Sequence, residues 1–376
     1  MQSSWQSERF PYRSWAEVDL SALQQNFDTL QAHASPGQGI IAVVKSNAYG
    51  HGAKQVVASL AKAKLFGVAT LEEAMEIRPL VPERDILLLA PSLPSEYAHI
   101  IAHGLIPMLS GVDEARALAR ASGDRPIRVC LHIDSGMGRM GIPLEHALPH
   151  LAEIGSIPGI AVHSISSHLP SADEDPEFTE MQLRSLTSAI PDWRKIFPHA
   201  AIHFLNSAGT LGFPKYANDF LRVGLALYGV SPLSAFSSLL IPVLTWKTRV
   251  ALVREVEANH SISYGRTYFT ARPSRLATLS LGYADGYPRI LSGQNQTVLI
   301  QGTHCPIVGR ITMNQIVVDT TNLSSVKAGD EVVLLGRQGN EEITATQLAS
   351  HAKTIPWEIL SRMGETVHRA YLHAAS

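Results

Sequence analysis

The fold of this chain is restricted most by a repeated alternation of short apolar runs with helical patterns between Ser21 and about Ser238. Most of the runs are continuously apolar, which is typical of parallel strands covered on both faces. Eight such runs favour a (β/α)8 barrel. Periodicity alone leaves an open doubly wound sheet as the alternative, although no GxGxxG follows the first run. The runs are residues 40–44, 65–70, 85–90, 105–109, 127–133, 160–167, 201–206 and 220–227.

The sequence changes in character after about Leu239. Strand-like segments now alternate with turns that contain Gly, Pro and Asn, and only residues 346–352 and 357–361 have a helical pattern. We therefore predict a barrel over residues 20–238 and a mainly β domain over residues 239–376. The predicted strands of this domain are residues 243–258, 275–283, 297–301, 306–308, 315–319 and 331–336.

Composition limits the classes of function. A net charge of −2 gives no electrostatic reason to expect nucleic acid or an anionic membrane as a partner. The start of the chain lacks the apolar region of a signal peptide, and no segment reaches membrane-spanning length, so we expect a cytoplasmic enzyme. The 16 histidines are scattered without zinc-ligand spacing, so no metal site is expected. The two cysteines, Cys130 and Cys305, lie in strand-like runs and do not suggest disulfides.

Chemically capable residues follow several of the predicted strands, where the active sites of such barrels lie. Lys45 ends the first run, Arg139 follows the fifth and His168 follows the sixth. A lysine at a poorly solvated strand end can form a Schiff base with a carbonyl cofactor, because such a site disfavours the charged amine. From its position alone, Lys45 fits an ordinary lysine that reaches the surface better than a Schiff-base lysine, since most lysines are exposed.

The seventh and eighth runs supply features that suit a phosphate group. Ser207 lies in an NSAG turn that leads into a helix, where exposed N–H groups can hold a phosphate. The backbone around Gly224, beside Arg222, offers further amides, and glycine allows close approach. The loops after strands seven and eight are the usual phosphate site of this barrel. Pyridoxal 5′-phosphate, a carbonyl cofactor with a phosphate, accounts for the lysine and the amides together.

These residues belong to a series of motifs that resembles the alanine racemase family and spans nearly the whole chain. The resemblance implies a barrel that binds pyridoxal phosphate, and a β domain that includes a strand at residues 12–19. It also implies a homodimer in which each active site is completed by the partner's β domain, and a role in making D-alanine for the cell wall. The motifs are AVVKSNAYGHG, HIDSGMGRMG, SHLPSAD, NSAGTL, LRVGLALYG, SYGRTY, GYADGY and VGRITMNQ.

The resemblance assigns the acid and base groups. Lys45 is similar to the Schiff-base lysine, which also moves a proton at Cα, and Tyr264 from the other subunit is similar to the second such group. Racemisation needs one proton removed from one face of Cα and returned to the other, so two opposed groups are expected. A tyrosine is a poor base without help from its surroundings. The resemblance assigns that help to His203.

Arg222 determines the type of reaction that the resemblance implies, because the family places this arginine against the pyridine nitrogen. A guanidinium has only donors and does not deprotonate, so it cannot accept a pyridinium proton. The ring is then a weaker electron sink, which favours prompt reprotonation at Cα over transamination.

The remaining residues are also assigned by the resemblance. Arg139 would bond near the phenolic oxygen of the cofactor and, together with the backbone N–H of Met313 from the partner, would hold the substrate carboxylate. His168 would lie behind the cofactor ring, and Tyr283 would line the access channel. The phosphate would be held by Tyr49, Ser207, Gly224, Leu225 and Tyr371.

Three positions depart from the family pattern. His132 stands where many members have a carbamylated lysine, and Thr312 and Asn314 replace a cysteine and an aspartate. The second change leaves a racemase that prefers serine, or a broader range of amino acids, as an alternative. A decarboxylase on the same barrel is disfavoured by Arg222, where those enzymes have an acid. A simple carrier of the cofactor is disfavoured by the second domain with Tyr264.

Overall fold

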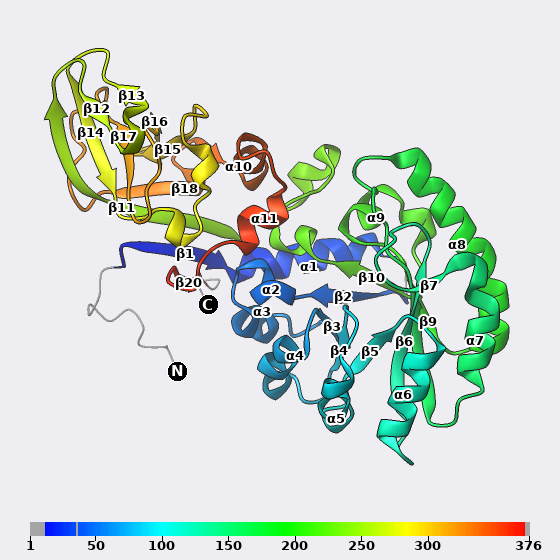
Figure 1. The fold of residues 1–376 in the computed structure, drawn as a ribbon. Coiled ribbons are helices and arrows are strands. Elements are labelled where there is room, and N and C mark those ends of the chain that lie inside the picture. Colours follow the sequence, from blue (N-terminus) through cyan, green and yellow to red (C-terminus); the bar gives the residue numbers. More distant parts are fainter. Residues whose placement is uncertain (1–11, 35–36, 373–376) are drawn as a thin grey trace. The chain divides into compact units, whose positions relative to one another are not determined.

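The computed structural model describes residues 12–34 and 37–372 of the chain. It divides into two compact units (Figure 1). One unit is Ala22–Ile241, and the other is formed by the described segments on either side of it. The barrel unit and the β unit are described separately below.

The barrel unit contains one parallel sheet of eight main strands, and it confirms the predicted (β/α)8 fold. The two ends of the sheet come together through backbone hydrogen bonds from Asp219 N–H to Ile202 O (3.0 Å) and from Arg222 N–H to Leu205 O (2.9 Å), so the barrel is nearly closed. In sheet order the strands are β10 (Phe220–Val223), β2 (Gly39–Val43), β3 (Leu65–Val68), β4 (Asp85–Leu88), β5 (Ile106–Leu109), β6 (Ile127–Asp134), β8 (Ile160–Ser166) and β9 (Ala201–His203), with β7 (Ile142–Pro143) beside β6.

The apolar runs follow from burial on both sides of this sheet. All four residues of β3 and of β5 are buried, as are Ile40 to Val43 in β2. Full burial of an aliphatic side chain contributes about 1.5–3 kcal/mol, so a run without polar gaps is favoured. One buried cluster in this unit comprises Ile41, Leu65, Leu87, Ile106, Met108 and Cys130.

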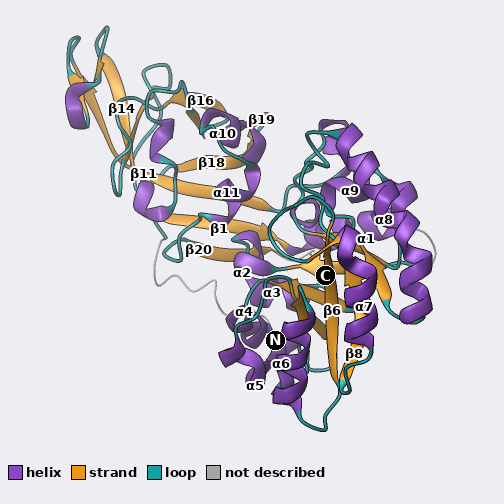
Figure 2. Ribbon diagram, turned by 45° about the vertical axis from the view of Figure 1, so that its right-hand side comes forward, coloured by secondary structure: helices purple, strands orange, loops and turns teal. Residues whose placement is uncertain are grey.

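Helices cover the outside of the barrel (Figure 2). Several begin at a side-chain cap: Thr70 accepts a hydrogen bond from Glu73 N–H, and Asp175 accepts one from Phe178 N–H. The helices are α1 (Leu20–His33), α2 (Lys45–Tyr49), α3 (Ala53–Ser59), α4 (Leu71–Ile77), α5 (Tyr97–Ala102), α6 (Val112–Ser122), α7 (Ala147–Gly155), α8 (Pro176–Ile196) and α9 (Ser207–Gly212).

The β unit is built on a nine-stranded sheet. Its early strand, β1 (Ser14–Asp19), pairs antiparallel with β11 (Leu244–Val256) and parallel with β20 (His368–Leu372). The first described strand therefore joins segments more than two hundred residues away. The other strands are β14 (Ser274–Leu279), β15 (Thr297–Ile300), β16 (Thr303–Pro306), β17 (Ile316–Asp319), β18 (Glu331–Gln338) and β19 (Glu341–Ile343), and the unit also has the hairpin β12 (Ser261–Ile262) with β13 (Tyr268–Phe269), and helices α10 (Ala345–His351) and α11 (Pro356–Ser361).

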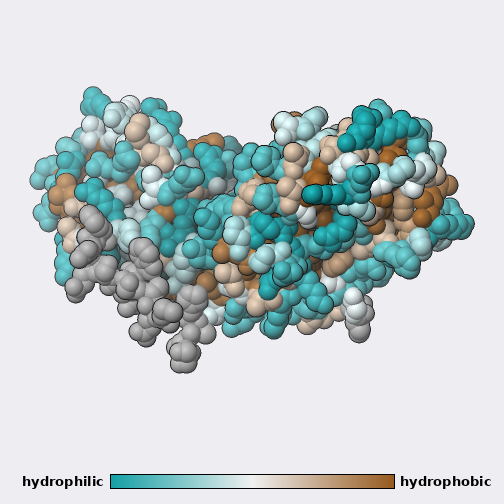
Figure 3. All heavy atoms as spheres, turned by 90° about the horizontal axis from the view of Figure 1, so that it is seen from below, coloured by the Kyte–Doolittle hydropathy of each residue, from teal (hydrophilic) through white to brown (hydrophobic). Residues whose placement is uncertain are grey.

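The surface seen in Figure 3 is largely hydrophilic, with hydrophobic residues in small interrupted groups. Within the part of the chain that the structure describes, no helix is both long and apolar enough to cross a membrane.

Candidate active site

Lys45 lies two residues after the end of β2 and is partly buried there. Burial lowers the pKa of its amine, and the charge of Arg139 lowers that pKa further, while the carboxylate of Glu73 opposes both effects. A lowered pKa increases the fraction of neutral amine, which is the nucleophilic form that condenses with a carbonyl. The geometry therefore gives Lys45 the property expected of a Schiff-base lysine.

The backbone after Lys45 makes an unusual left-handed turn. Ser46, Asn47, Ala48 and Tyr49 all have φ between 52° and 53°, a region that residues with a Cβ rarely occupy. Glu73 stabilises the turn, because its carboxylate accepts hydrogen bonds from the N–H groups of Ser46 (2.6 Å) and Ala69 (2.7 Å). The side chain of Asn47 accepts a further bond from Ala53 N–H (2.8 Å). The turn thus fixes the strand end that carries Lys45.

Arg222 on β10 is buried at the centre of a hydrogen-bond network in the barrel unit. One Nη donates to Nδ1 of His203 (2.7 Å), and the other donates to the carbonyl of Ser167 (2.6 Å) and to Nδ1 of His168 (3.0 Å). Burial lowers the pKa of the guanidinium to about 10, which leaves it charged at neutral pH. Arg222 is therefore in direct contact with two other predicted residues, His203 and His168.

The contacts of Arg222 determine the protonation of both histidines. A guanidinium has donors and no acceptor, so each Nδ1 that faces it must carry a lone pair and each neutral ring must be protonated on Nε2. Burial, followed by the charge of Arg222, lowers the pKa of His203 and of His168 well below the ordinary value. Both rings are consequently neutral, and Arg222 is the cation of this group.

The predicted phosphate-binding residues of the barrel meet where β10 ends. Asn206 caps α9 by accepting a hydrogen bond from Gly209 N–H (2.9 Å), which places Ser207 in the first turn of that helix. Ser207 Oγ accepts hydrogen bonds from the N–H groups of Gly224 (3.0 Å) and Ala226 (3.3 Å). Leu225 lies between these two residues and begins the next turn.

Glycine is required at position 224 by the approach of Tyr49. A Cβ on Gly224 would overlap with the hydroxyl of Tyr49. The ring of Tyr49 packs against that of Tyr228 with centroids 4.9 Å apart, and burial raises the pKa of its hydroxyl, so the group stays protonated. Tyr49, Ser207, Gly224 and Leu225 are therefore gathered around one small region, as the sequence predicts.

His132 lies on β6, and Arg139 lies in the loop that follows this strand. Arg139 is exposed in the loop after the strand, and its charge lowers the pKa of Lys45 and of His168. His132 is buried, and its Nδ1 lies 2.9 Å from Ser166 Oγ. Burial and the nearby charges of Arg222 and Arg139 lower the pKa of His132 to about 3, so the ring is neutral. A neutral imidazole thus stands at position 132, one of the three positions that depart from the expected pattern.

In the β unit, the loop of residues 308–315 carries Met313 and bonds to the segments that carry two other predicted residues, Tyr264 and Tyr283. The carbonyl of Arg310 accepts a hydrogen bond from Ser263 Oγ (2.6 Å), next to Tyr264. The carbonyl of Thr312 accepts one from Tyr283 N–H (3.0 Å), and that of Met313 accepts one from Ala284 N–H (3.0 Å). Gly282 is required here, since a Cβ would overlap with the carbonyls of residues 312 and 313.

The side chains of these three residues are exposed in the single chain. Tyr264 is 72% exposed, Met313 is 55% exposed and Tyr283 is 39% exposed. The fourth predicted residue of the β unit, Tyr371, lies on β20 and pairs with Val18 of β1. Burial raises the pKa of the Tyr371 hydroxyl.

Sequence reasoning missed Glu73, which holds the left-handed turn, and Ser167, whose carbonyl accepts from Arg222. Glu73 lies outside the recognised motifs, so no local signal identifies its role. Ser167 begins the SHLPSAD motif at the end of the sixth run, but a backbone carbonyl leaves no residue-specific signal. Among the described residues no cluster of His, Cys, Asp or Glu could hold a metal ion. The cysteines, Cys130 and Cys305, are both free and buried.

Comparison with known proteins places this arrangement in context. Residues 18–232 match the pattern described as "Alanine racemase, N-terminal domain", and residues 243–371 match "Alanine racemase, C-terminal domain". The chain is 42% identical to the alanine racemase of Symbiobacterium thermophilum, with 95% of this chain and 97% of that one covered.

Solved structures agree with the sequence comparison. The crystal structure of alanine racemase from Streptomyces lavendulae is similar with a TM-score of 0.89 and 36% identity, covering 97% of this chain and 98% of that one. A second similar structure is alanine racemase from Bartonella henselae with covalently bound pyridoxal phosphate. It has a TM-score of 0.87 and 30% identity, and the match covers 96% of this chain and 100% of that one.

Proposed function

The chain belongs to the alanine racemase family, and on this premise we propose that it interconverts L-alanine and D-alanine with pyridoxal 5′-phosphate as its cofactor. The observation that carries the proposal is the buried Arg222, which donates to two neutral histidines in the same unit as a lysine of lowered pKa. A guanidinium at the ring nitrogen suits a racemase, because it has no acceptor for a ring proton.

The residues present fit this cofactor. Lys45 offers a partly neutral amine for the covalent link to the aldehyde carbon. Ser207 Oγ lies beside the N–H of Gly224, and the missing Cβ of Gly224 lets the Tyr49 hydroxyl approach the same place, so polar groups suited to a phosphate are gathered here. When bound, the cofactor supplies the electron sink that makes the Cα–H of an amino acid acidic. Tyr371 would be a further phosphate-binding residue.

Two groups move the proton in the proposed reaction. Lys45 removes or returns a proton at one face of Cα, and Tyr264 does so at the opposite face. Tyr264 is exposed in the single chain, and we assign it to the active site of a partner subunit in a homodimer. Arg139 and the backbone N–H of the partner's Met313 would hold the substrate carboxylate, and Tyr283 would narrow the access channel. His168 and His203 support the site through Arg222.

The proposed role follows from this reaction. In the role that we propose, the enzyme would supply D-alanine for peptidoglycan synthesis in the cytoplasm. No partner beyond a second copy of the chain and a small amino acid is needed for the reaction.

The direct test is to incubate the purified protein, loaded with pyridoxal 5′-phosphate, with L-alanine and to separate the enantiomers by chiral chromatography. We expect D-alanine to accumulate until the two enantiomers are equal. Absence of D-alanine above the level of the Lys45→Ala variant would contradict the proposal.

The second candidate function is a racemase that prefers serine or accepts a broader range of amino acids, and it rests on Thr312 and Asn314. Thr312 uses its hydroxyl within its own loop, donating to Gln315 O (2.9 Å), so this side chain is committed to the turn. Rates for alanine, serine and larger amino acids in the same assay rank the substrates, and we expect alanine to be fastest. Carbon dioxide release at a comparable rate would favour the decarboxylase instead.

A further inference from the structure

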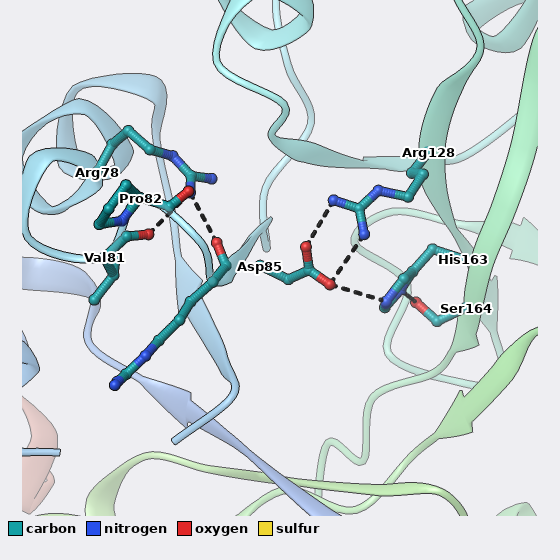
Figure 4. Close-up of polar contacts among 8 residues, drawn as sticks. Arg78, Val81, Pro82, Asp85, Arg128, His163 and Ser164 are labelled. Atoms are coloured by element: carbon teal, nitrogen blue, oxygen red, sulfur yellow. Dashed lines mark hydrogen bonds and ion pairs between the residues drawn. The ribbon is translucent and has the colours of Figure 1, made fainter. Parts of the chain in front are cut away.

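Behind Arg222, a chain of polar contacts crosses the barrel unit to a carboxylate. Arg222 donates to Nδ1 of His203, whose Nε2 lies 3.3 Å from Ser164 Oγ. Ser164 Oγ is in turn 3.1 Å from Nδ1 of His163. His163 Nε2 faces the carboxylate of Asp85 at 3.8 Å, longer than a hydrogen bond but within ion-pair range. Figure 4 shows Asp85 between Arg128 and His163.

The direction of every contact in this chain is determined by its two ends. Arg222 can only donate, so His203 accepts at Nδ1 and carries its proton on Nε2. This Nε2 lies 3.3 Å from Ser164 Oγ and 3.8 Å from Cys130 Sγ. The shorter contact assigns this proton to Ser164. The hydroxyl hydrogen of Ser164 is then free to bond to Nδ1 of His163. His163 therefore carries its proton on Nε2, which points to a carboxylate that can only accept. A cation at one end and an anion at the other thus favour the same orientation throughout.

This series of polar contacts connects the two ends of the barrel. Asp85 is the first residue of β4 and Arg128 is the second residue of β6, so both lie where strands begin. The side chains of Asp85 and His163 are 32% and 17% exposed, whereas Ser164 and His203 are fully buried. Lys45 lies beyond the other end of the parallel strands, where β2 has ended. The contacts therefore run from the exposed end of the barrel inward to Arg222.

We propose that Asp85, His163 and Ser164 are positioning residues that act through His203 to orient and polarise Arg222. The inference rests on the proposed function, in which Arg222 faces the ring nitrogen of the cofactor. A carboxylate at the far end makes His203 Nδ1 a stronger acceptor, because polarised hydrogen bonds in a poorly solvated interior reinforce one another. The stronger acceptor holds the guanidinium in place and reduces the positive charge that it presents to its other partners.

The groups around His163 keep its ring neutral, as the series of polar contacts requires. Burial lowers its pKa, and the charge of Arg128 on β6 acts in the same direction, whereas Asp85 on β4 raises the pKa. A protonated His163 would carry a hydrogen on Nδ1 and would no longer accept from Ser164.

The competing explanation is that Asp85 and Arg128 form a structural ion pair only. Their side chains make two contacts, of 2.6 Å and 3.0 Å, which join β4 to β6. Two variants separate the explanations, because both remove this pair. Asp85→Asn also removes the carboxylate that faces His163, whereas Arg128→Gln leaves it in place. A purely structural role predicts equal effects of the two substitutions.

The kinetic test compares Asp85→Asn and His163→Phe with Arg128→Gln. We expect kcat for alanine to fall about threefold to tenfold in the first two variants, the range that corresponds to the net free energy of one hydrogen bond. KM should stay within about twofold, since substrate contacts are unchanged. Asp28→Asn, which breaks the surface ion pair with Lys62, is the control for loss of a carboxylate elsewhere on the barrel. Equal kcat in Asp85→Asn and Arg128→Gln would overturn the inference.

A second readout does not depend on activity. With ¹⁵N-labelled histidine, the ring nitrogens of His203, assigned by their loss in His203→Gln, should show an unprotonated Nδ1 and a protonated Nε2. Asp85→Asn should shift both resonances although it lies two side chains away, and Arg128→Gln should shift them less. Unchanged His203 resonances in Asp85→Asn would also overturn the inference. If the native protein does not racemise alanine, the proposed function fails, while the nitrogen spectra still decide whether the chain of contacts exists.

Discussion

The two groups of candidate site residues differ in how far a single chain completes them. In the barrel unit, Arg222 and His203 are buried and hydrogen-bonded to each other. In the β unit, Tyr264 and Met313 are more than half exposed, although the loop that carries Met313 is well bonded to its surroundings.

The difference indicates which parts of the site are prepared in advance. Burial fixes the protonation of the barrel residues, since the pKa values of His168 and His203 are far below neutral pH. The side chain of Tyr264, in contrast, is exposed in the single chain, and in the proposed homodimer its surroundings come from the other subunit. We therefore attribute cofactor binding to the barrel and the second proton-transfer group to the β unit of a partner subunit.

The largest expected effect comes from Lys45→Ala, which removes the proposed covalent link and one acid–base group together. Racemisation should fall by about 10⁴-fold or more. Reduction with borohydride followed by peptide mass analysis should attach the cofactor to the native chain and not to this variant. Lys54→Ala, which affects a surface ion pair with Glu76, is the control. Cofactor fixed to another residue of the native protein would contradict the assignment.

Tyr264→Phe should reduce racemisation by about 10²–10³-fold, because one of two acid–base groups is lost while the fold is kept. The variant should still exchange the Cα hydrogen of one enantiomer with deuterated water, using Lys45. NMR of both enantiomers in deuterated water measures this asymmetry. Tyr268→Phe, in the same hairpin, should behave as the native protein does. Undiminished racemisation in Tyr264→Phe would place the second group elsewhere.

Gly224→Ala tests the barrel unit alone, because the added Cβ would overlap with the Tyr49 hydroxyl. Overpacking costs about 1–3 kcal/mol, so affinity for pyridoxal 5′-phosphate should fall about fivefold to hundredfold. Titration of the cofactor-free protein, followed by absorbance, gives the dissociation constant. Gly111→Ala is the matched control, since a Cβ there meets open space. Equal affinities in the two variants would show that this region does not bind the cofactor.

Glu73→Gln should have the smallest effect. Glutamine can accept only with its oxygen, so one of the N–H groups of Ser46 and Ala69 loses its partner, at a cost of about 1–3 kcal/mol in the free energy of unfolding. The carboxylate raises the pKa of Lys45, so its removal lowers that pKa and exposes the neutral amine at lower pH. Reductive methylation of Lys45 in the cofactor-free protein, measured against pH, should show a midpoint moved to lower pH. A midpoint moved upward would contradict the assigned sign.

Much of the barrel could be predicted from the sequence, because strands buried on both faces leave continuous apolar runs. The strand end then made Lys45 a candidate, while its role and that of Arg222 were assigned through the motifs that resemble the family. The left-handed turn could not be predicted, because Ser46 and Ala48 carry a Cβ, and the bond that supports the turn from outside comes from Glu73, 27 residues beyond Ser46.

Long-range pairing accounts for the rest of what sequence could not show. The pairing of β1 with β20 joins the two ends of the described chain and leaves no local pattern. The same holds for Asp85 and His163, which lie on separate strands and meet only when the barrel forms. Tyr264 was identified through its motif alone, because an exposed tyrosine in a turn has no distinctive local environment.

The most direct test of a site divided between two subunits is to mix the Lys45→Ala and Tyr264→Phe proteins, each nearly inactive alone, after reversible dissociation. Random reassociation gives hybrid dimers in which one of the two sites has both Lys45 and the partner's intact tyrosine, so about a quarter of native activity should return. Hybrid dimers that form, as seen by native mass spectrometry, and yet show no recovered racemisation would contradict the shared site.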